Sequence, residues 1–170
     1  IRRMEDTVED VEATLETLLM LARTEQRQPD NEDVIVNDLA VNLMERLSPL
    51  ADRKQIRLQV RQTALLTVHS PEVALTIVLT NLVRNAINYS GSGDVTILVA
   101  EKTVHVVDYG AGMDADELAR ILKPFERGQS QEAGHGLGLA IVQRLCERYH
   151  WHLMVTSAPG RGTEVAIRFS

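Results

Sequence analysis

Three asparagines on one predicted helix are the first candidates for chemistry. Asn81, Asn85 and Asn88 recur at steps of four and three residues in an apolar stretch that follows Pro71, so a helix would present all three amides on one face. Asparagine is a poor helix former, and an unpaired buried amide costs about 1–3 kcal/mol. A solvated helix face would more often carry Glu, Lys or Gln. Because an amide oxygen is a hard, neutral ligand, the row is typical of a Mg²⁺ site beside phosphate anions.

A carboxylate followed by two glycines is the second candidate. The segment from Asp108 to Met113 (DYGAGM) follows an apolar run that predicts a strand. Gly110 and Gly112 suit a chain that must turn or approach another group closely. A carboxylate at a strand end can accept a hydrogen bond from an exocyclic amine such as that of adenine, although a plain Asp-Gly turn is the simpler alternative.

A glycine run before a helix is the third candidate. The segment from Gly134 to Leu139 (GHGLGL) directly precedes a helical apolar pattern, so backbone N–H groups and a positive helix end converge there. This favours a phosphate ligand, but the spacing fits neither the dinucleotide-binding fingerprint nor a P-loop. We expect the preceding residues, 124–127 and the polar stretch to 133, to form a hinge and a mobile lid.

Composition limits the classes of protein to consider. The chain has 170 residues, of which 44% are hydrophobic and 25% charged, as in one globular domain with an appendage. Its net charge of -6 argues against a nucleic-acid partner. No apolar run is long enough to cross a bilayer. The sequence opens inside a helical pattern, so we expect a piece of a longer protein whose membrane anchor, if any, lies outside it.

The elements that must position these residues fall into two parts. Near the N-terminus, apolar residues recur in a strict alternation of four and three steps, which predicts a coiled-coil helix. Such a helix packs against a partner helix rather than on its own domain. Its seam consists of Met4, Val8, Val11, Leu15, Leu18 and Ala22. Residues 1–27 are assigned to this helix, 28–33 to a linker, and 34–170 to a second domain.

The second domain is predicted to be a two-layer α/β (α+β) sandwich, with a mixed sheet packed on helices. One helix should run towards Ala51 from a cap at Asn37 or Asp38, and another should start from a Ser70 hydroxyl cap with Pro71 as its first residue. A third helix is expected over 137–149. The predicted strands are 34–36, 56–60, 65–68, 95–100, 104–107, 153–156 and 164–169.

The order of these motifs resembles that of the sensor histidine kinases of bacterial two-component systems, within the wider group that includes gyrase, Hsp90 and MutL ATPases. Segments 81–86, 108–113, 124–127 and 134–139 are similar to the N, G1, F and G2 boxes, and Gly162-Thr163 to the closing adenine-side motif. The resemblance covers 34–170 and implies a Bergerat-type ATP-binding fold. The first helix resembles the second helix of the dimerisation and histidine-phosphotransfer domain.

The resemblance implies ATP and Mg²⁺ as ligands, with Asn85 binding the metal and Asp108 reading the adenine amine. It assigns Asn81, Asn85 and Arg127 to catalysis. The residues that it places around the nucleotide are Asn85, Asn88, Tyr89, Asp108, Gly110, Gly112, Met113, Gly134, Gly136, Leu137, Gly138, Leu139 and Thr163.

The reaction implied by the resemblance is transfer of the γ-phosphoryl group of Mg-ATP to a histidine. Asn81 stands where the related ATPases carry a glutamate that activates water, and an amide cannot take a proton at neutral pH. The nucleophile should therefore be supplied by a histidine on the missing part of the dimerisation domain, for relay to a response regulator aspartate. None of the five histidines lies in a predicted acidic helix, so the chain alone is not expected to autophosphorylate.

The same resemblance implies a homodimer through the dimerisation helices, in the cytoplasmic portion of an inner-membrane sensor. Two alternatives share the nucleotide motifs. An anti-sigma-type serine kinase usually lacks the seam helix, whereas a non-catalytic nucleotide-binding and dimerisation module would suit the few basic residues of the lid. Three departures stand out: Asn88 where the family often has Lys, Ser70 where it usually has Asp, and a short lid without a second arginine.

Overall fold

The computed structural model describes residues 30–91, 93–122 and 136–170, together with residues 4, 8, 11, 12, 15, 18, 19, 21–23 and 26 near the N-terminus. Side chains are described for these residues except at 136–138.

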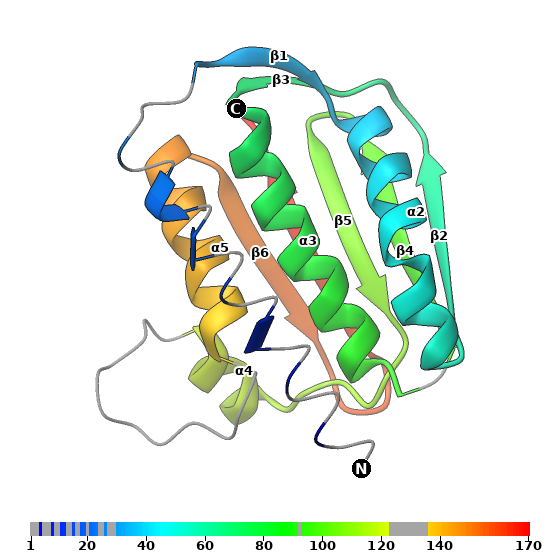
Figure 1. The fold of residues 1–170 in the computed structure, drawn as a ribbon. Coiled ribbons are helices and arrows are strands. Elements are labelled where there is room, and N and C mark those ends of the chain that lie inside the picture. Colours follow the sequence, from blue (N-terminus) through cyan, green and yellow to red (C-terminus); the bar gives the residue numbers. More distant parts are fainter. Residues whose placement is uncertain are drawn as a thin grey trace.

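A five-stranded mixed sheet forms one layer of the domain (Figure 1). Strands β2 and β4 are parallel, and the remaining neighbours are antiparallel. Across the sheet the order is β2 (Ile56–Gln62), β4 (Gly93–Ala100), β5 (Thr103–Asp108), β7 (Thr163–Arg168) and β6 (His152–Ser157).

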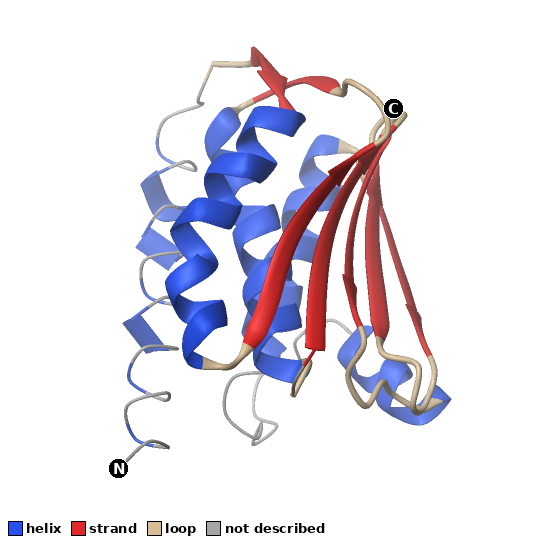
Figure 2. Ribbon diagram, turned by 90° about the vertical axis from the view of Figure 1, so that its right-hand side faces the viewer, coloured by secondary structure: helices blue, strands red, loops and turns tan. Residues whose placement is uncertain are grey.

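Helices cover one face of this sheet, as Figure 2 shows. They are α2 (Val36–Arg53), α3 (Glu72–Tyr89) and α5 (Gly136–Tyr149). A short sheet of β1 (Glu32–Ile35) and β3 (Thr67–Ser70) lies at one end of the molecule, and α4 (Ala115–Leu122) lies at the other (Figure 1). The predicted two-layer sandwich is confirmed, and every predicted strand is present with its ends shifted by at most two residues.

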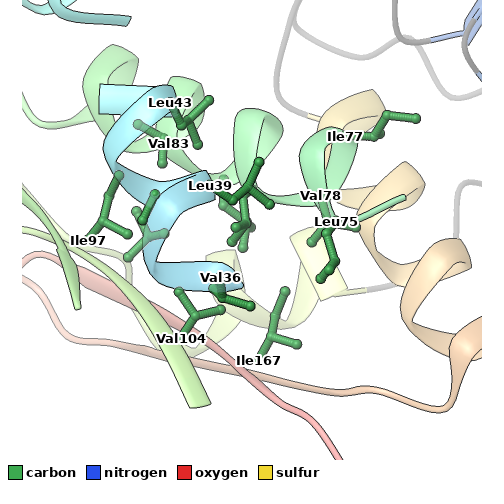
Figure 3. Close-up of a cluster of buried hydrophobic side chains, with 14 of the residues drawn as sticks. Val36, Leu39, Leu43, Leu75, Ile77, Val78, Val83, Ile97, Val104 and Ile167 are labelled. Atoms are coloured by element: carbon green, nitrogen blue, oxygen red, sulfur yellow. The ribbon is translucent and has the colours of Figure 1, made fainter. Parts of the chain in front are cut away.

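The hydrophobic core lies between the helices and the sheet. Side chains of α2 and α3 converge on Ile97, Val104 and Ile167 of the sheet (Figure 3). Alternate residues of β5 are buried, as expected for a strand with one covered face, and Asp108 continues that buried face. The core also takes in Cys146, whose burial raises the pKa of its thiol to about 12.

The predicted cap of α2 is wrong. The helix begins at Val36, and no side chain caps it. The Asn37 amide instead donates to Gln62 Oε1 and to the Ala64 carbonyl, both at 2.9 Å, and accepts from the Leu66 N–H at 2.9 Å. These bonds satisfy backbone groups of the 63–66 turn that would otherwise be buried without partners, so the tertiary contact prevails over capping.

The predicted hydroxyl cap of α3 is also wrong. Pro71 occupies the cap position, Glu72 is the first helical residue, and no side chain caps the helix. Ser70 is held in β3 opposite Glu32, and its hydroxyl donates to the Pro71 carbonyl at 3.3 Å. The chain therefore stays extended one residue further than predicted, because the β1–β3 ladder fixes Ser70 as a strand residue.

Helix α4 was not predicted, although the sequence contains its signal. Asp114 Oδ1 accepts from the Glu117 N–H at 2.8 Å, and the Asp114 carbonyl accepts from the Leu118 N–H at 3.0 Å. An acidic cap with Glu three residues later is typical of a helix start.

The predicted seam of the N-terminal segment faces solvent. Each described residue from 4 to 26 is helical. Met4, Val8, Val11, Leu15 and Leu18 are 75%, 56%, 61%, 55% and 44% exposed, and Ala22 is exposed as well, whereas Leu21 joins the core. An apolar stripe is thus left without a partner within the described residues, and the partner helix stays a prediction. No described helix combines the length and apolar character needed to cross a bilayer.

Candidate functional site

Asp108 places a buried carboxylate at the end of the central strand β5. The side chain is 6% exposed and lies on the face that the helices cover. It accepts the Gly110 N–H at 3.0 Å and the backbone N–H of Thr163, its neighbour on β7. Burial raises the pKa of this carboxyl more than the two hydrogen bonds lower it. An ionised carboxylate has room for about four hydrogen bonds, so acceptor capacity remains for a ligand.

The glycines after Asp108 allow a close backbone approach. A Cβ at Gly110 would lie 2.6 Å from the Tyr89 carbonyl oxygen at the end of α3. Gly112 has φ +68°, and a Cβ there would lie 2.0 Å from the Ala158 carbonyl oxygen. Because neither backbone oxygen can move aside cheaply, the chain needs glycine at both positions.

Residues 108–113 and 157–163 interlock, and we call the two segments the loop junction. The Gly160 N–H donates to the Ala111 carbonyl at 2.7 Å, and the Met113 N–H donates to Ser157 Oγ at 2.8 Å. A Cβ at Gly162, where φ is +76°, would lie 2.1 Å from the Asp108 carbonyl oxygen. The junction therefore holds the surroundings of the Asp108 carboxylate in a fixed shape.

The three asparagines lie half-buried on α3, and we call Asn81, Asn85 and Asn88 the asparagine face. Asn81 Nδ2 donates back to the Ile77 carbonyl of its own helix at 2.7 Å. The amides of Asn85 and Asn88 have no hydrogen-bond partner within the described part of the chain. Two of the three amides are therefore available to a ligand.

The C-terminal end of α3 brings the asparagine face next to the loop junction. Tyr89 is 40% exposed there, and the contact between its carbonyl and Gly110 joins the helix end to the segment after Asp108. Ser90, the next residue, is buried, and its hydroxyl has no partner among the described groups. An unpaired buried hydroxyl of this kind costs free energy of folding, and the Thr80 hydroxyl on α3 is left in the same way.

The predicted phosphate segment is described in part. α5 packs against α3, and its N-terminal end lies at the same end of the molecule as the C-terminal ends of α3 and β5 (Figure 1). The backbone is helical from Gly136 through Gly138, and Leu139 is buried. Arg127 and Gly134 lie outside the described residues, as do the predicted hinge and lid at 124–133.

Two of the histidines in the described part of the chain pair with neighbouring side chains. His69 pairs with Asp33 at 2.8 Å, and His105 contacts Glu164 at 2.6 Å and Thr103 at 3.0 Å. All four described histidines lie in strands or at a turn, and His135 lies outside the described residues. Among the residues that the structure describes, no three His, Cys, Asp or Glu side chains are grouped to hold a metal.

The sequence analysis did not identify Ser157, whose hydroxyl joins the two segments of the loop junction. Ser157 stands at the end of a strand whose residues alternate in burial, where a serine usually meets solvent. Its contacts to Met113 and Gly162 depend on the fold, and no local sequence pattern predicts them.

The family comparison covers most of this site. Residues 70–170 match the family described as histidine kinase-, DNA gyrase B-, and HSP90-like ATPase. The phosphate regulon sensor protein PhoR of Pseudomonas aeruginosa is 29% identical over 181 residues, which cover 100% of this chain and 41% of that protein. The sensor-like histidine kinase SenX3 of Mycobacterium tuberculosis is 29% identical over 161 residues, which cover 88% of this chain and 39% of that protein. The chain thus spans about two fifths of the length of these relatives.

Solved structures agree with these relatives. Full-length ShkA in complex with AMPPNP has a TM-score of 0.74 at 28% identity, over 93% of this chain and 35% of that one. The cytoplasmic segment of the histidine kinase QseC has a TM-score of 0.68 at 20% identity, over 95% and 94% of the two chains, and supports the fold. Since the family model covers more than half of the sequence, this chain belongs to the histidine kinase-, DNA gyrase B-, and HSP90-like ATPases and carries the ATP-binding domain of a sensor histidine kinase.

Proposed function

We propose that this chain binds ATP together with Mg²⁺ and transfers the γ-phosphoryl group to a histidine on the dimerisation domain of its kinase, for relay to a response regulator aspartate. The observation that carries the proposal is a juxtaposition at one end of the fold. The buried, partly satisfied carboxylate of Asp108 lies beside the end of a helix whose Asn85 and Asn88 amides have no described partner.

Asp108 is suited to bind the adenine amine. Its carboxylate is ionised above its raised pKa, and two backbone N–H groups hold it in place. An ionised carboxylate accepts hydrogen bonds and donates none, so it favours a 6-amino group over the 6-oxo group of guanine. Gly110 and Gly112 let the segment after Asp108 pack against the Tyr89 and Ala158 carbonyls and so fix the shape of the base site, while Met113 and Thr163 would flank the base.

The asparagine face and the start of α5 are suited to the phosphates. Asn85 would supply an amide oxygen to the metal, with Asn88 and Tyr89 beside it. Mg²⁺, when bound, would offset the negative charge of the phosphate oxygens. Backbone N–H groups at a helix N-terminus bind phosphate, which is the part proposed for Gly134, Gly136, Leu137, Gly138 and Leu139. Arg127 would add a cation.

Asn81 favours transfer to a side chain over hydrolysis. Its Nδ2 is held by the Ile77 carbonyl, which fixes the amide one turn before Asn85. An amide in this position can orient a neighbour but cannot remove a proton from water. Phosphoryl transfer then depends on a nucleophile presented in line, which an imidazole on the dimerisation domain would provide.

The exposed seam supports dimerisation in the full kinase. A helix with five apolar seam residues in solvent is completed by partner helices, as in a bundle formed by two copies. The same seam separates this reading from an anti-sigma-type serine kinase, which usually lacks it. Attachment to an inner membrane would come from segments beyond this sequence.

Calorimetry and a transfer assay test the proposal. The chain should bind ADP and ATP in the presence of Mg²⁺ and bind GTP more weakly. Labelled ATP alone should leave no phosphohistidine on the chain, whereas an added domain with the phospho-accepting helix should acquire acid-labile, base-stable label. Equal binding of ATP and GTP would reject the adenine assignment, and label on His69, His105, His135, His150 or His152 would place the acceptor within this chain.

A further inference from the structure

Ser157 carries more hydrogen bonds than any other side chain of the loop junction. Its hydroxyl oxygen lies 2.8 Å from the Met113 backbone nitrogen, 2.9 Å from the Gly162 carbonyl oxygen and 2.9 Å from Thr163 Oγ1. These contacts tie the end of β6 to both segments of the junction. Neither composition nor motif draws attention to this residue.

The three contacts fix the direction of each hydrogen bond. A serine hydroxyl has one proton and two acceptor lone pairs. The Met113 N–H can only donate, so it takes one lone pair, and the Gly162 carbonyl can only accept, so it takes the proton. One lone pair remains for Thr163, and all three contacts are satisfied together only if the Thr163 hydroxyl donates its proton to Ser157.

The Thr163 hydroxyl is left as a hydrogen-bond acceptor beside the Asp108 carboxylate, which is also an acceptor. Its proton is engaged by Ser157, so Oγ1 can meet any further group only as an acceptor, through its two lone pairs. Thr163 is half-buried, it pairs with Asp108 across the ladder, and its backbone N–H donates to the Asp108 carboxylate. A nucleobase edge that meets both residues must therefore offer hydrogen-bond donors.

We propose that Ser157 is a positioning residue for base selection: by holding the Thr163 proton, it makes Thr163 an acceptor and so disfavours a 6-oxo purine. The proposal rests on the adenine site proposed above. An amino group at the purine 6-position donates to this edge, whereas an oxo group would place an acceptor against acceptors. Ser157 itself acts through Thr163 and need not contact the base.

The test compares ADP and GDP binding, each with Mg²⁺, by calorimetry on the whole chain. Ser157→Ala frees the Thr163 proton, so the hydroxyl can rotate and donate to a 6-oxo group. We expect ADP affinity to fall about tenfold, as for the loss of one hydrogen bond, and the GDP-to-ADP ratio of dissociation constants to fall by about the same factor. Ser157→Thr, which retains the hydroxyl, should restore both values.

Thr156→Ala is the matched control, because it removes an exposed hydroxyl one residue away that has no described partner. It should match the wild type in both affinities and in melting temperature. If Ser157→Ala does not fold, Thr163→Val provides the second measurement: it deletes the acceptor, so ADP binding should weaken while GDP binding does not.

Two results would overturn the proposal. One is Ser157→Ala losing ADP and GDP affinity equally, which would make the residue a support for the loops alone. The other is Ser157→Ala keeping the wild-type ratio at wild-type affinity. A wild type that does not prefer ADP at all would instead reject the adenine site, so the two failures are distinguishable.

Discussion

The loop junction and the asparagine face of α3 lie at the same end of the fold, but they differ in whether their polar side chains have hydrogen-bond partners. In the junction, the hydroxyl of Ser157 is saturated, and hypothetical Cβ atoms at Gly112 and Gly162 meet backbone oxygens at 2.0 and 2.1 Å. On α3, the amides of Asn85 and Asn88 have no partner among the described residues.

On the proposed function, this difference separates recognition of the base at the loop junction from binding of the charged phosphates and metal at the asparagine face. Preorganised donors and acceptors discriminate between bases because they cannot adjust to the wrong one. The phosphates and metal proposed for the asparagine face would bring strong charges to its open amides, so the chain itself would not need to satisfy them. Asn37 shows the alternative use of the same residue type, because both its N–H groups and its oxygen are bonded within the fold, to Gln62, Ala64 and Leu66.

The largest expected effect is a change within the junction. Gly112→Ala should destabilise the protein far more than Gly160→Ala, although both glycines have positive φ, +68° and +75°. A left-handed alanine costs about 1–2 kcal/mol, and only Gly112 adds a collision, with the Ala158 carbonyl oxygen. We expect a difference of at least about 2 kcal/mol in the free energy of unfolding, measured with urea. Equal losses of unfolding free energy in the two variants would mean that the junction rearranges at little cost.

The next effect concerns the asparagine that serves the fold. Asn37→Ala should lower the free energy of unfolding by about 2–3 kcal/mol, because the buried Leu66 N–H and the Ala64 carbonyl lose their partner. Nucleotide affinity of the folded protein should stay unchanged, since Asn37 lies on α2, away from the loop junction. A Tm within the error of the wild type would show that the turn finds other partners.

Asn85→Ala should show the reverse pattern. The change deletes a proposed metal ligand and no described hydrogen bond, so the free energy of unfolding without nucleotide should change by about 0.5 kcal/mol or less. The Mg²⁺-dependent part of ATP affinity should fall about tenfold or more, equivalent to about 1.4 kcal/mol. Calorimetry with and without Mg²⁺ separates the two contributions. A large loss of Tm with intact Mg²⁺ dependence would assign Asn85 to the fold.

The strands and the spacing of the site residues could be predicted from sequence because they follow from local rules. Alternation places every second residue of β5 in the core, and helical periodicity puts Asn81, Asn85 and Asn88 on one side of α3. Both patterns operate within a few residues, so the surrounding fold does not alter them.

The starts of α2 and α3 and the loop junction could not be predicted, because distant partners decide them. Asn37 is drawn away from capping by groups 25 to 29 residues along the chain, and Ser157 accepts a hydrogen bond from a residue 44 positions earlier. Ser70 is likewise fixed by its pairing with β1. The local conformational preference is overridden in each case because a tertiary hydrogen bond gives a buried backbone group its partner.

The smallest expected effect is a pH dependence of nucleotide binding that arises from Asp108. Burial raises the pKa of its carboxyl above the ordinary value of 3.8, so the folded state holds the proton more tightly than the unfolded state does. The cost of the buried charge is therefore present above the raised pKa and is relieved as the pH falls through it. Binding of the adenine amine needs the ionised form, so ADP affinity should fall over the same range, about twofold where half of the carboxyl is protonated. Phosphate groups of the ligand also titrate, and Asp108→Asn provides the control because it keeps their contribution while removing that of the carboxyl. Calorimetry from pH 7 downwards should show an additional fall in the wild type that Asp108→Asn lacks; parallel profiles would mean that the carboxylate does not bind the base.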